Sequence, residues 1–243
     1  MRLRVVVALA LAPAAIAAGA PGPAPAAATA PRVEVMVVGK AKVLAAPRFV
    51  RPSATTLTVG RHRCGVASAT PLAALAAVRR AGGPDFRLRD YGSCSRRTVD
   101  SSALFVTQVG PDRNRRADGW VYKVGRRVPS IGAADPSGRR LRTGDRLTWF
   151  YCRAQSSGGC QRTLEVVPLS AAGQPLRVLV RGYDDNGRAV VVAGATVSAG
   201  VQTAVTGADG TASFPPFGAA ATRTVQAQRA GLVPSFPVKV AST

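Results

Sequence analysis

Short runs of alternating apolar and polar residues, bounded by Gly, Pro or Asp, follow one another along the chain from residue 33 to residue 152. Such runs are typical of β-strands, because successive side chains of a strand point to opposite faces. We expect strands in the segments 33–39, 56–60, 86–91, 104–109, 119–124 and 146–152.

A helical pattern interrupts these runs near residue 70. Thr70 is a good N-cap, Pro71 suits the first helical position, and Leu72, Leu75 and Val78 form an apolar stripe with helical spacing. One main helix packed on a mixed sheet predicts an α+β fold for this part of the chain.

The last eighty residues have a different pattern, with shorter strand-like runs and no helical stripe. Asp-Gly and Asn-Gly turn signals at 184–187 and 208–210 separate the runs. The segments expected to be strands are 164–169, 176–183, 189–192, 195–198, 203–205, 211–214, 222–229 and 235–240. Short strands at this spacing predict an all-β sandwich, so we expect a mainly β protein.

The charge of the chain also changes between these two parts. Residues 32–163 carry 22 Arg and 3 Lys against 8 acidic residues, a net charge of +17, whereas residues 164–243 carry only +2. A hydrophobic fraction of 47% excludes a wholly disordered chain. We therefore predict two domains, residues 31–163 and residues 164–243.

Residues 1–30 have the pattern of an export signal. Arg2 and Arg4 precede an apolar run over 5–20, and Ala26 to Ala28 provide the small residues of a cleavage site. The alternative is a retained membrane anchor, but the run is short for a span and contains Pro13. The pattern predicts a secreted, extracellular product with no membrane span after signal cleavage.

Four cysteines in an exported chain indicate two disulfide bonds, and four cysteines allow three pairings. We favour Cys64–Cys94 and Cys152–Cys160, because a flexible stretch containing Gly-Gly separates the second pair. A zinc site is the alternative. It is disfavoured because no Cys-x-x-Cys occurs and the chain has a single His.

The two aromatic segments, Gly-Trp-Val-Tyr-Lys-Val at 119–124 and Gly-Asp-Arg-Leu-Thr-Trp-Phe-Tyr-Cys at 144–152, occur together and in order. With them, residues 33–155 resemble the small domain at the C-terminus of transcobalamin, which also occurs in bacterial exported proteins. This resemblance implies a β-grasp-like fold. The sequence departs from the family pattern at Gly125, where Asn is usual.

The second part resembles transthyretin-like or carboxypeptidase-regulatory-like domains. The residues that carry the resemblance are Gly-Ala-Thr-Val at 194–197 and Thr-Gly-Ala-Asp-Gly-Thr-Ala-Ser-Phe at 206–214. Such domains are mostly spacers in exported proteins, so the resemblance implies an immunoglobulin-like sandwich with a structural role.

The aromatic strands are the candidate ligand site. Trp120 and Tyr122 share one strand face, and Trp149 and Tyr151 share another, because each pair is two residues apart. The corresponding domain of transcobalamin covers one face of a corrin, so the resemblance implies a wall for a corrinoid or another small apolar ligand. The loop residues Arg126 and Arg127 are then expected at its rim. The alternative is that the four rings are packed core.

The arginine pairs are a second candidate, because a domain with a net charge of +17 attracts polyanions. The expected partner is an anionic wall polymer or another extracellular polyanion. The alternative is a solvated surface that reflects Arg-rich composition alone.

Catalytic patterns are lacking: the sequence has no Gly-rich phosphate loop, few acidic residues and one His. The sequence therefore predicts a secreted, non-catalytic binding or cell-surface protein with no resident metal or cofactor. The alternatives are a structural protein held to anionic wall polymer and an unrecognised secreted enzyme.

Overall fold

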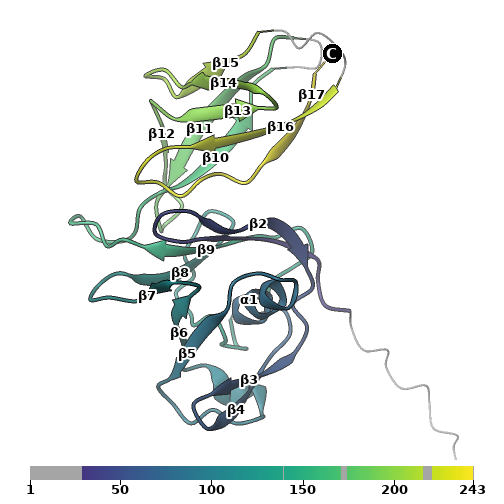
Figure 1. Ribbon diagram of the computed structural model, residues 1–243, viewed down its shortest axis with the longest axis vertical. Coiled ribbons are helices and arrows are strands. Elements are labelled where there is room, and N and C mark those ends of the chain that lie inside the picture. The colour runs from purple at the N-terminus through teal and green to yellow at the C-terminus, as the bar shows by residue number, and fades with distance from the viewer. Residues whose placement is uncertain (1–28, 139, 171–173, 216–220, 243) are drawn as a thin grey trace, which may run out of the picture.

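The computed structural model describes residues 29–138, 140–170, 174–215 and 221–242. The predicted signal segment 1–30 lies almost entirely outside the described residues, as do Arg139 and the segments 171–173 and 216–220. The described chain is mainly β, with one α-helix, and forms two lobes that lie one above the other in Figure 1. We call residues 29–162 the N-terminal lobe and residues 163–242 the C-terminal lobe.

The N-terminal lobe is built around a mixed sheet and the α-helix. Its elements are β1 (Val33–Val38), β2 (Val43–Val50), β3 (Thr55–Val59), β4 (His62–Val66), α1 (Pro71–Arg80), β5 (Phe86–Asp90), a 3₁₀ turn (Thr98–Ser101), β6 (Leu104–Val109), β7 (Asp112–Arg113), β8 (Gly119–Val124) and β9 (Arg146–Cys152). Each strand predicted for this lobe is present.

Four strands form the main sheet in the order β2-β1-β9-β8, with β1 and β9 parallel. Strand alternation sends Val35 and Val37 of β1 toward the core around α1, and it sends Met36 and Val38 toward the C-terminal lobe. The sheet therefore has α1 against one face and the C-terminal lobe against the other (Figure 1). The strand pair β3-β4 and the three-stranded sheet β5-β6-β7 extend the lobe away from this junction.

Helix α1 begins where the sequence predicts. The Thr70 hydroxyl accepts a hydrogen bond from the Ala73 amide at 3.2 Å, and Pro71 occupies the first turn. Leu72, Leu75 and the other residues of the helix through Val78 are buried in the core of the lobe. The helix thus covers the face of the main sheet on which the aromatic side chains of β8 and β9 lie.

The C-terminal lobe consists of two four-stranded sheets that share one core. Its strands are β10 (Thr163–Pro168), β11 (Arg177–Tyr183), β12 (Ala189–Val191), β13 (Thr196–Ala199), β14 (Gln202–Val205), β15 (Thr211–Ser213), β16 (Ala221–Gln228) and β17 (Val238–Ser242). One sheet contains β10, β11, β12 and β15, and the other has the order β14-β13-β16-β17. Val178 and Val180 of the first sheet pack with Val197 and Val225 of the second.

A small third hydrophobic cluster joins the two lobes. Met36 and Phe150 of the N-terminal sheet pack against Val233 and Phe236 of the C-terminal lobe. The Leu164 amide also donates to the Val233 carbonyl at 2.9 Å, so the segment before β17 is attached to the start of β10. Strand β10, the first strand of the C-terminal lobe, begins at Thr163.

The predicted disulfide pairing is confirmed. Cys64 is bonded to Cys94 with Cα atoms 5.2 Å apart, and Cys152 is bonded to Cys160 with Cα atoms 5.1 Å apart. The first bond joins β4 to the loop after β5, and the second closes a loop directly after β9.

Candidate functional site

The four aromatic side chains of β8 and β9 lie side by side, as their strand positions predict. Trp120 is opposite Tyr151 and Tyr122 is opposite Trp149, with ring centroids 5.9 Å and 5.3 Å apart. All four point to the face of the sheet that α1 covers, where their exposed fractions are 3%, 1%, 7% and 1% in the order named. The rings therefore occupy core positions and form no open wall.

The polar atoms of the four rings are satisfied within the lobe. They donate four hydrogen bonds to backbone carbonyls: Trp120 Nε1 to Asp112 (2.7 Å), Tyr122 Oη to Ile131 (2.6 Å), Trp149 Nε1 to Pro71 (3.2 Å) and Tyr151 Oη to Arg113 (3.1 Å). Burial, with the Asp135 charge as a second cause, raises the pKa of Tyr122 to about 12. The four side chains are therefore packed core residues, and they offer no free face to a corrinoid.

Arg126 and Arg127 do not lie at the rim of the aromatic group. They follow Gly125, whose φ of +61° permits the tight turn between Val124 and Arg127. The Arg126 guanidinium forms a bidentate ion pair with Glu165 of the C-terminal lobe, with both N–O distances 2.7 Å, and lies over the Tyr183 ring at 4.7 Å. Arg126 therefore links the lobes on the far side of the sheet, and Arg127 is exposed beside it.

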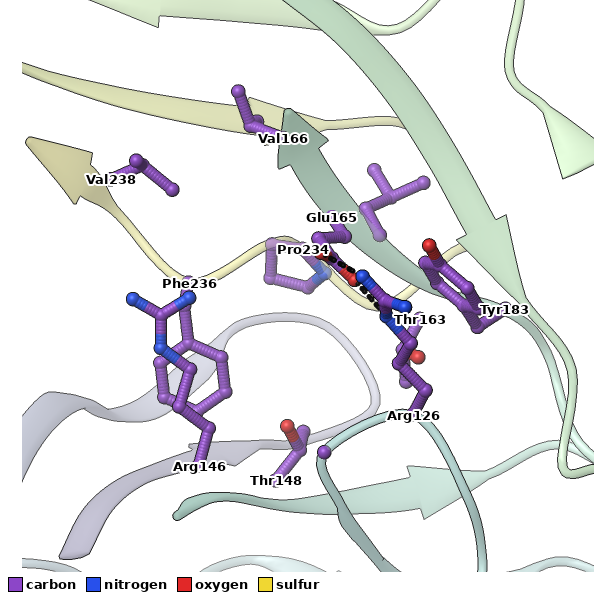
Figure 2. Close-up of a pocket in the computed structure, with 12 residues that line it drawn as sticks. Arg126, Arg146, Thr148, Thr163, Glu165, Val166, Tyr183, Pro234, Phe236 and Val238 are labelled. Carbon is purple, nitrogen blue, oxygen red and sulfur yellow. Dashed lines mark hydrogen bonds and ion pairs between the residues drawn. The ribbon is translucent and has the colours of Figure 1, made fainter. Parts of the chain in front are cut away.

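A pocket of about 190 Å³ lies at the junction of the lobes. Figure 2 shows the Arg126–Tyr183 and Arg146–Phe236 pairs on opposite sides of it, with Pro234 between them. Both cations are already neutralised, Arg126 by Glu165 and Arg146 by Glu34, the latter at 3.0 Å. The pocket can therefore accept a small and mostly apolar group.

The Tyr183 hydroxyl gives this pocket one unused polar atom. Tyr183 lines the pocket and is buried, and its hydroxyl has no hydrogen-bond partner among the described residues. A buried hydroxyl without a partner is uncommon, because its desolvation is uncompensated. The hydroxyl oxygen is itself closed to solvent, so a ligand with one hydrogen-bonding group reaches it only after a neighbouring side chain moves.

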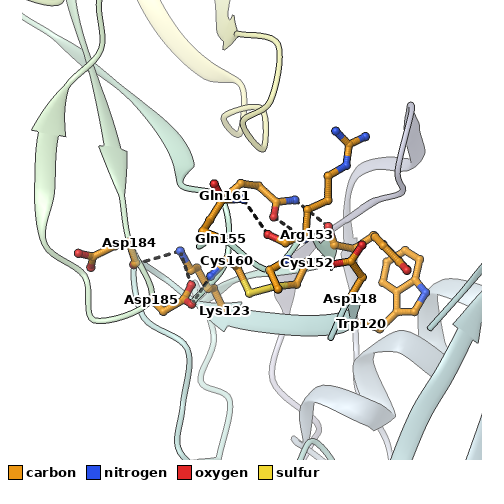
Figure 3. The surroundings of a disulfide bond; sticks show 12 residues. Asp118, Trp120, Lys123, Cys152, Arg153, Gln155, Cys160, Gln161, Asp184 and Asp185 are labelled. Atoms are coloured by element: carbon orange, nitrogen blue, oxygen red, sulfur yellow. Dashed lines mark hydrogen bonds and ion pairs between the residues drawn. A yellow bond between two sulfur atoms is a disulfide. The ribbon is translucent and has the colours of Figure 1, made fainter. Parts of the chain in front are cut away.

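Lys123 is a buried lysine that joins the lobes beside the second disulfide bond (Figure 3). Its Nζ donates to the carbonyl oxygens of Tyr183 at 2.9 Å and Asp184 at 3.0 Å, and it lies 3.4 Å from Asp185 Oδ1. The Cys160 amide donates to the other Asp185 oxygen at 2.8 Å. Burial lowers the pKa of Lys123, and the Asp185 carboxylate opposes this shift.

A second depression at the junction is cationic, and we call it the junction cleft. It has a volume of about 440 Å³ and is formed by the β1–β2 turn and by the segment after β16. Lys40, Lys42 and Arg229 line it, and none of its described lining residues is acidic. The Lys40 ammonium itself lies 4.4 Å from the centroid of the Tyr151 ring, so the cleft is cationic by its lining residues and not by three converging charges. A lining with cationic and no acidic residues still favours an anionic group of a ligand.

Sequence reasoning missed the residues that make this junction. Lys123 lies inside the aromatic motif, where alternation places it on the face opposite Trp120 and Tyr122, but nothing in the pattern shows what that face contacts. Arg229 is some 190 residues from Lys40 in the chain, so their proximity is a property of the fold. The alternation of β8 is the one signal that could have indicated a second buried face.

Comparison of the chain with protein-family models, with curated proteins and with solved structures finds no match. Within the described residues, no helix is long and apolar enough to cross a membrane. The same residues contain no group of three or more His, Cys, Asp or Glu side chains arranged to hold a metal ion.

Proposed function

We propose that the chain is an exported, non-catalytic protein that associates with an anionic polymer at the cell surface through its N-terminal lobe. The two disulfide bonds fit an oxidising compartment. The charge difference, +17 for residues 32–163 against +2 for residues 164–243, supports an attraction that acts mainly through the N-terminal lobe.

Unpaired surface arginines are the observation that carries this proposal. Most arginines of the N-terminal lobe are exposed and form no ion pair with a carboxylate of the described residues. They are Arg32, Arg51, Arg61, Arg63, Arg80, Arg87, Arg89, Arg96, Arg97, Arg113, Arg115, Arg116, Arg127, Arg142 and Arg153. Their guanidinium groups remain free to pair with phosphate or carboxylate.

The junction cleft is the proposed place where one acidic group of the polymer is held. Lys40 and Lys42 come from the N-terminal lobe and Arg229 from the C-terminal lobe, so an anion bound there contacts both lobes. Distributed arginines then supply attraction over distance, and the cleft supplies a fixed contact.

The test is binding of the full chain to a polyglycerol phosphate over a range of salt concentrations. We expect the logarithm of the association constant to fall linearly with the logarithm of salt concentration, because bound cations release counterions. The triple variant Lys40→Ser, Lys42→Ser, Arg229→Ser should bind several-fold more weakly. A matched control is Arg177→Ser, Arg181→Ser, Lys239→Ser, which removes three exposed charges from the C-terminal lobe. Salt-independent binding, or equal losses in both variants, contradicts the proposed site.

We also propose the finer fold assignments. A helix across a mixed sheet with parallel central strands β1 and β9 supports a β-grasp-like N-terminal lobe that resembles the C-terminal domain of transcobalamin. Two sheets around one core support a transthyretin-like or carboxypeptidase-regulatory-like sandwich in the C-terminal lobe. The sandwich acts as a spacer that also closes the junction.

The unpaired Tyr183 hydroxyl favours a second candidate function, binding of a small apolar ligand in the junction pocket. The probe set is a series of small aromatic alcohols and ketones, measured by ligand-observed NMR against the full chain. Tyr183→Phe retains the ring and removes the hydroxyl, so it should weaken binding several-fold without loss of stability. Unchanged binding by this variant contradicts a role for the hydroxyl.

A further inference from the structure

Two aromatic side chains of the N-terminal lobe are exposed and lie against each other. Tyr91, directly after β5, is 64% exposed, and Phe105 of β6 is 45% exposed. Their ring centroids are 6.1 Å apart and their planes meet at 66°. We call these two rings the aromatic corner. Rings of this size are usually buried, so two adjacent exposed ones indicate a contact surface.

Arginines surround the aromatic corner. Arg89 is directly opposite Phe105 in the β5–β6 pairing, and its guanidinium lies 4.7 Å from the centroid of the Tyr91 ring. Arg87 is also exposed and shares this face, because it is two residues before Arg89, whereas Leu88 packs against the core. Arg96 and Arg97 are exposed in the loop that follows Tyr91.

Asp90, between Arg89 and Tyr91 in the chain, forms no ion pair with these arginines among the described residues, and its carboxylate holds the loop instead. Asp90 accepts hydrogen bonds from the Gly92 amide at 3.0 Å and the Cys94 amide at 2.8 Å. The Cys64–Cys94 disulfide bond then attaches the same loop to β4. The aromatic corner is therefore held in place before any ligand binds, which lowers the entropy cost of binding.

We propose that the aromatic corner binds one sugar ring of an acidic polysaccharide, with the carboxylate or other acidic group of that sugar paired to Arg87 or Arg89. Two rings at 66° form an angled surface that a puckered ring can contact on two sides. A flat nucleobase stacks on one ring plane at a time, and successive bases need successive platforms. A second copy of this chain is excluded as the occupant, because its net charge of +21 repels the same surface.

This inference rests on the proposed function and names the chemistry that the anionic polymer carries. The acidic groups provide the attraction, as on the rest of the lobe, and the sugar rings provide the selectivity. Polymers with equal charge but no rings should therefore bind without using the aromatic corner.

The experiment measures binding of the full chain to three polyanions at one salt concentration: a polyuronate, inorganic polyphosphate and single-stranded DNA. The variants are Tyr91→Ala and Phe105→Ala, singly and together. The control is Phe49→Ala, because Phe49 is 53% exposed and lies 3.9 Å from the Arg32 guanidinium but has no aromatic neighbour in contact among the described residues. Thermal unfolding checks that each variant is folded.

The double variant should lose about tenfold or more in affinity for the polyuronate, a loss typical of one stacking contact, and should bind polyphosphate like the parent. Phe49→Ala should match the parent with all three. Equal polyuronate binding by parent and double variant overturns the inference and leaves the proposed function standing. A greater loss for DNA than for polyuronate also overturns it in favour of a nucleic-acid surface. Absence of binding to every polyanion at low salt overturns both proposals.

Discussion

Replacing Lys123 by methionine removes an ammonium group but keeps an unbranched side chain of similar length. The carbonyl oxygens of Tyr183 and Asp184 and the Asp185 carboxylate then lose their shared donor. A buried acceptor left without a donor costs about 1–3 kcal/mol, and breaking a buried charge pair costs about 3–5 kcal/mol. The buried ammonium carries its own desolvation cost, which its removal recovers. We expect the free energy of unfolding to fall by about 2–4 kcal/mol.

Urea denaturation followed by two signals measures this change. Both tryptophans, Trp120 and Trp149, lie in the N-terminal lobe, so their fluorescence reports that lobe, whereas far-UV circular dichroism reports both. The parent should show coincident transitions, because the lobes share a hydrophobic cluster. Lys123→Met should lower the midpoint by about 1 M or more. It should also separate the two curves.

Lys42→Met is the matched control, because Lys42 is exposed and its loss leaves no buried acceptor. A double-mutant cycle with Asp185→Asn isolates the coupling between the two charges. Coincident curves for Lys123→Met at the parent midpoint refute the reasoning. They show that the packed methionine compensates fully for the lost hydrogen bonds.

Three further predictions concern the interior. Trp149→Ala should cost about 3–5 kcal/mol of stability and leave polyanion affinity per folded molecule unchanged, as denaturation and binding on the same sample will show. Tyr122→Phe should lose the hydrogen bond to Ile131 at neutral pH. In the folded chain the pKa of Tyr122 is about 12, whereas in the unfolded chain the hydroxyl loses its proton near pH 10. The stability of the parent should therefore fall relative to that of the variant as the pH rises from about 10 to about 12. By the size of the shift, the fall is about 3 kcal/mol at most. Replacing Cys152 and Cys160 together by serine should lower the free energy of unfolding by about 2–3 kcal/mol, because the disulfide bond no longer constrains the unfolded chain across a separation of eight residues. Thermal unfolding measures this loss.

Local patterns were sufficient for most of the secondary structure. The helix followed from Thr70 and Pro71, and the alternating runs identified most strands of both lobes. Strand β2 was missed because Pro47 interrupts it, although β2 lies at the edge of its sheet, where proline is tolerated. Strand β4 was missed because His62 to Gly65 lack the β-branched and aromatic residues of a typical strand.

The candidate site was harder to predict, because burial depends on what covers each face. Alternation correctly grouped Trp120 with Tyr122 and Trp149 with Tyr151, but it could not show that α1 covers them. The sequence pattern does not single out exposed Tyr91, since a single aromatic residue beside Gly92 carries no periodic signal. Pairing with Phe105 appears only when β5 and β6 are aligned.

The main sheet of the N-terminal lobe has consequences for how this chain can be cut and recombined. Because Met36, Val121 and Phe150 face the C-terminal lobe, a fragment that ends near residue 162 exposes them to water as one apolar surface. Such a fragment should self-associate, and soluble preparation of it requires polar replacements at those positions. The same apolar surface limits which domains can follow the N-terminal lobe. An unrelated domain in place of the C-terminal lobe must also bury Met36, Val121 and Phe150.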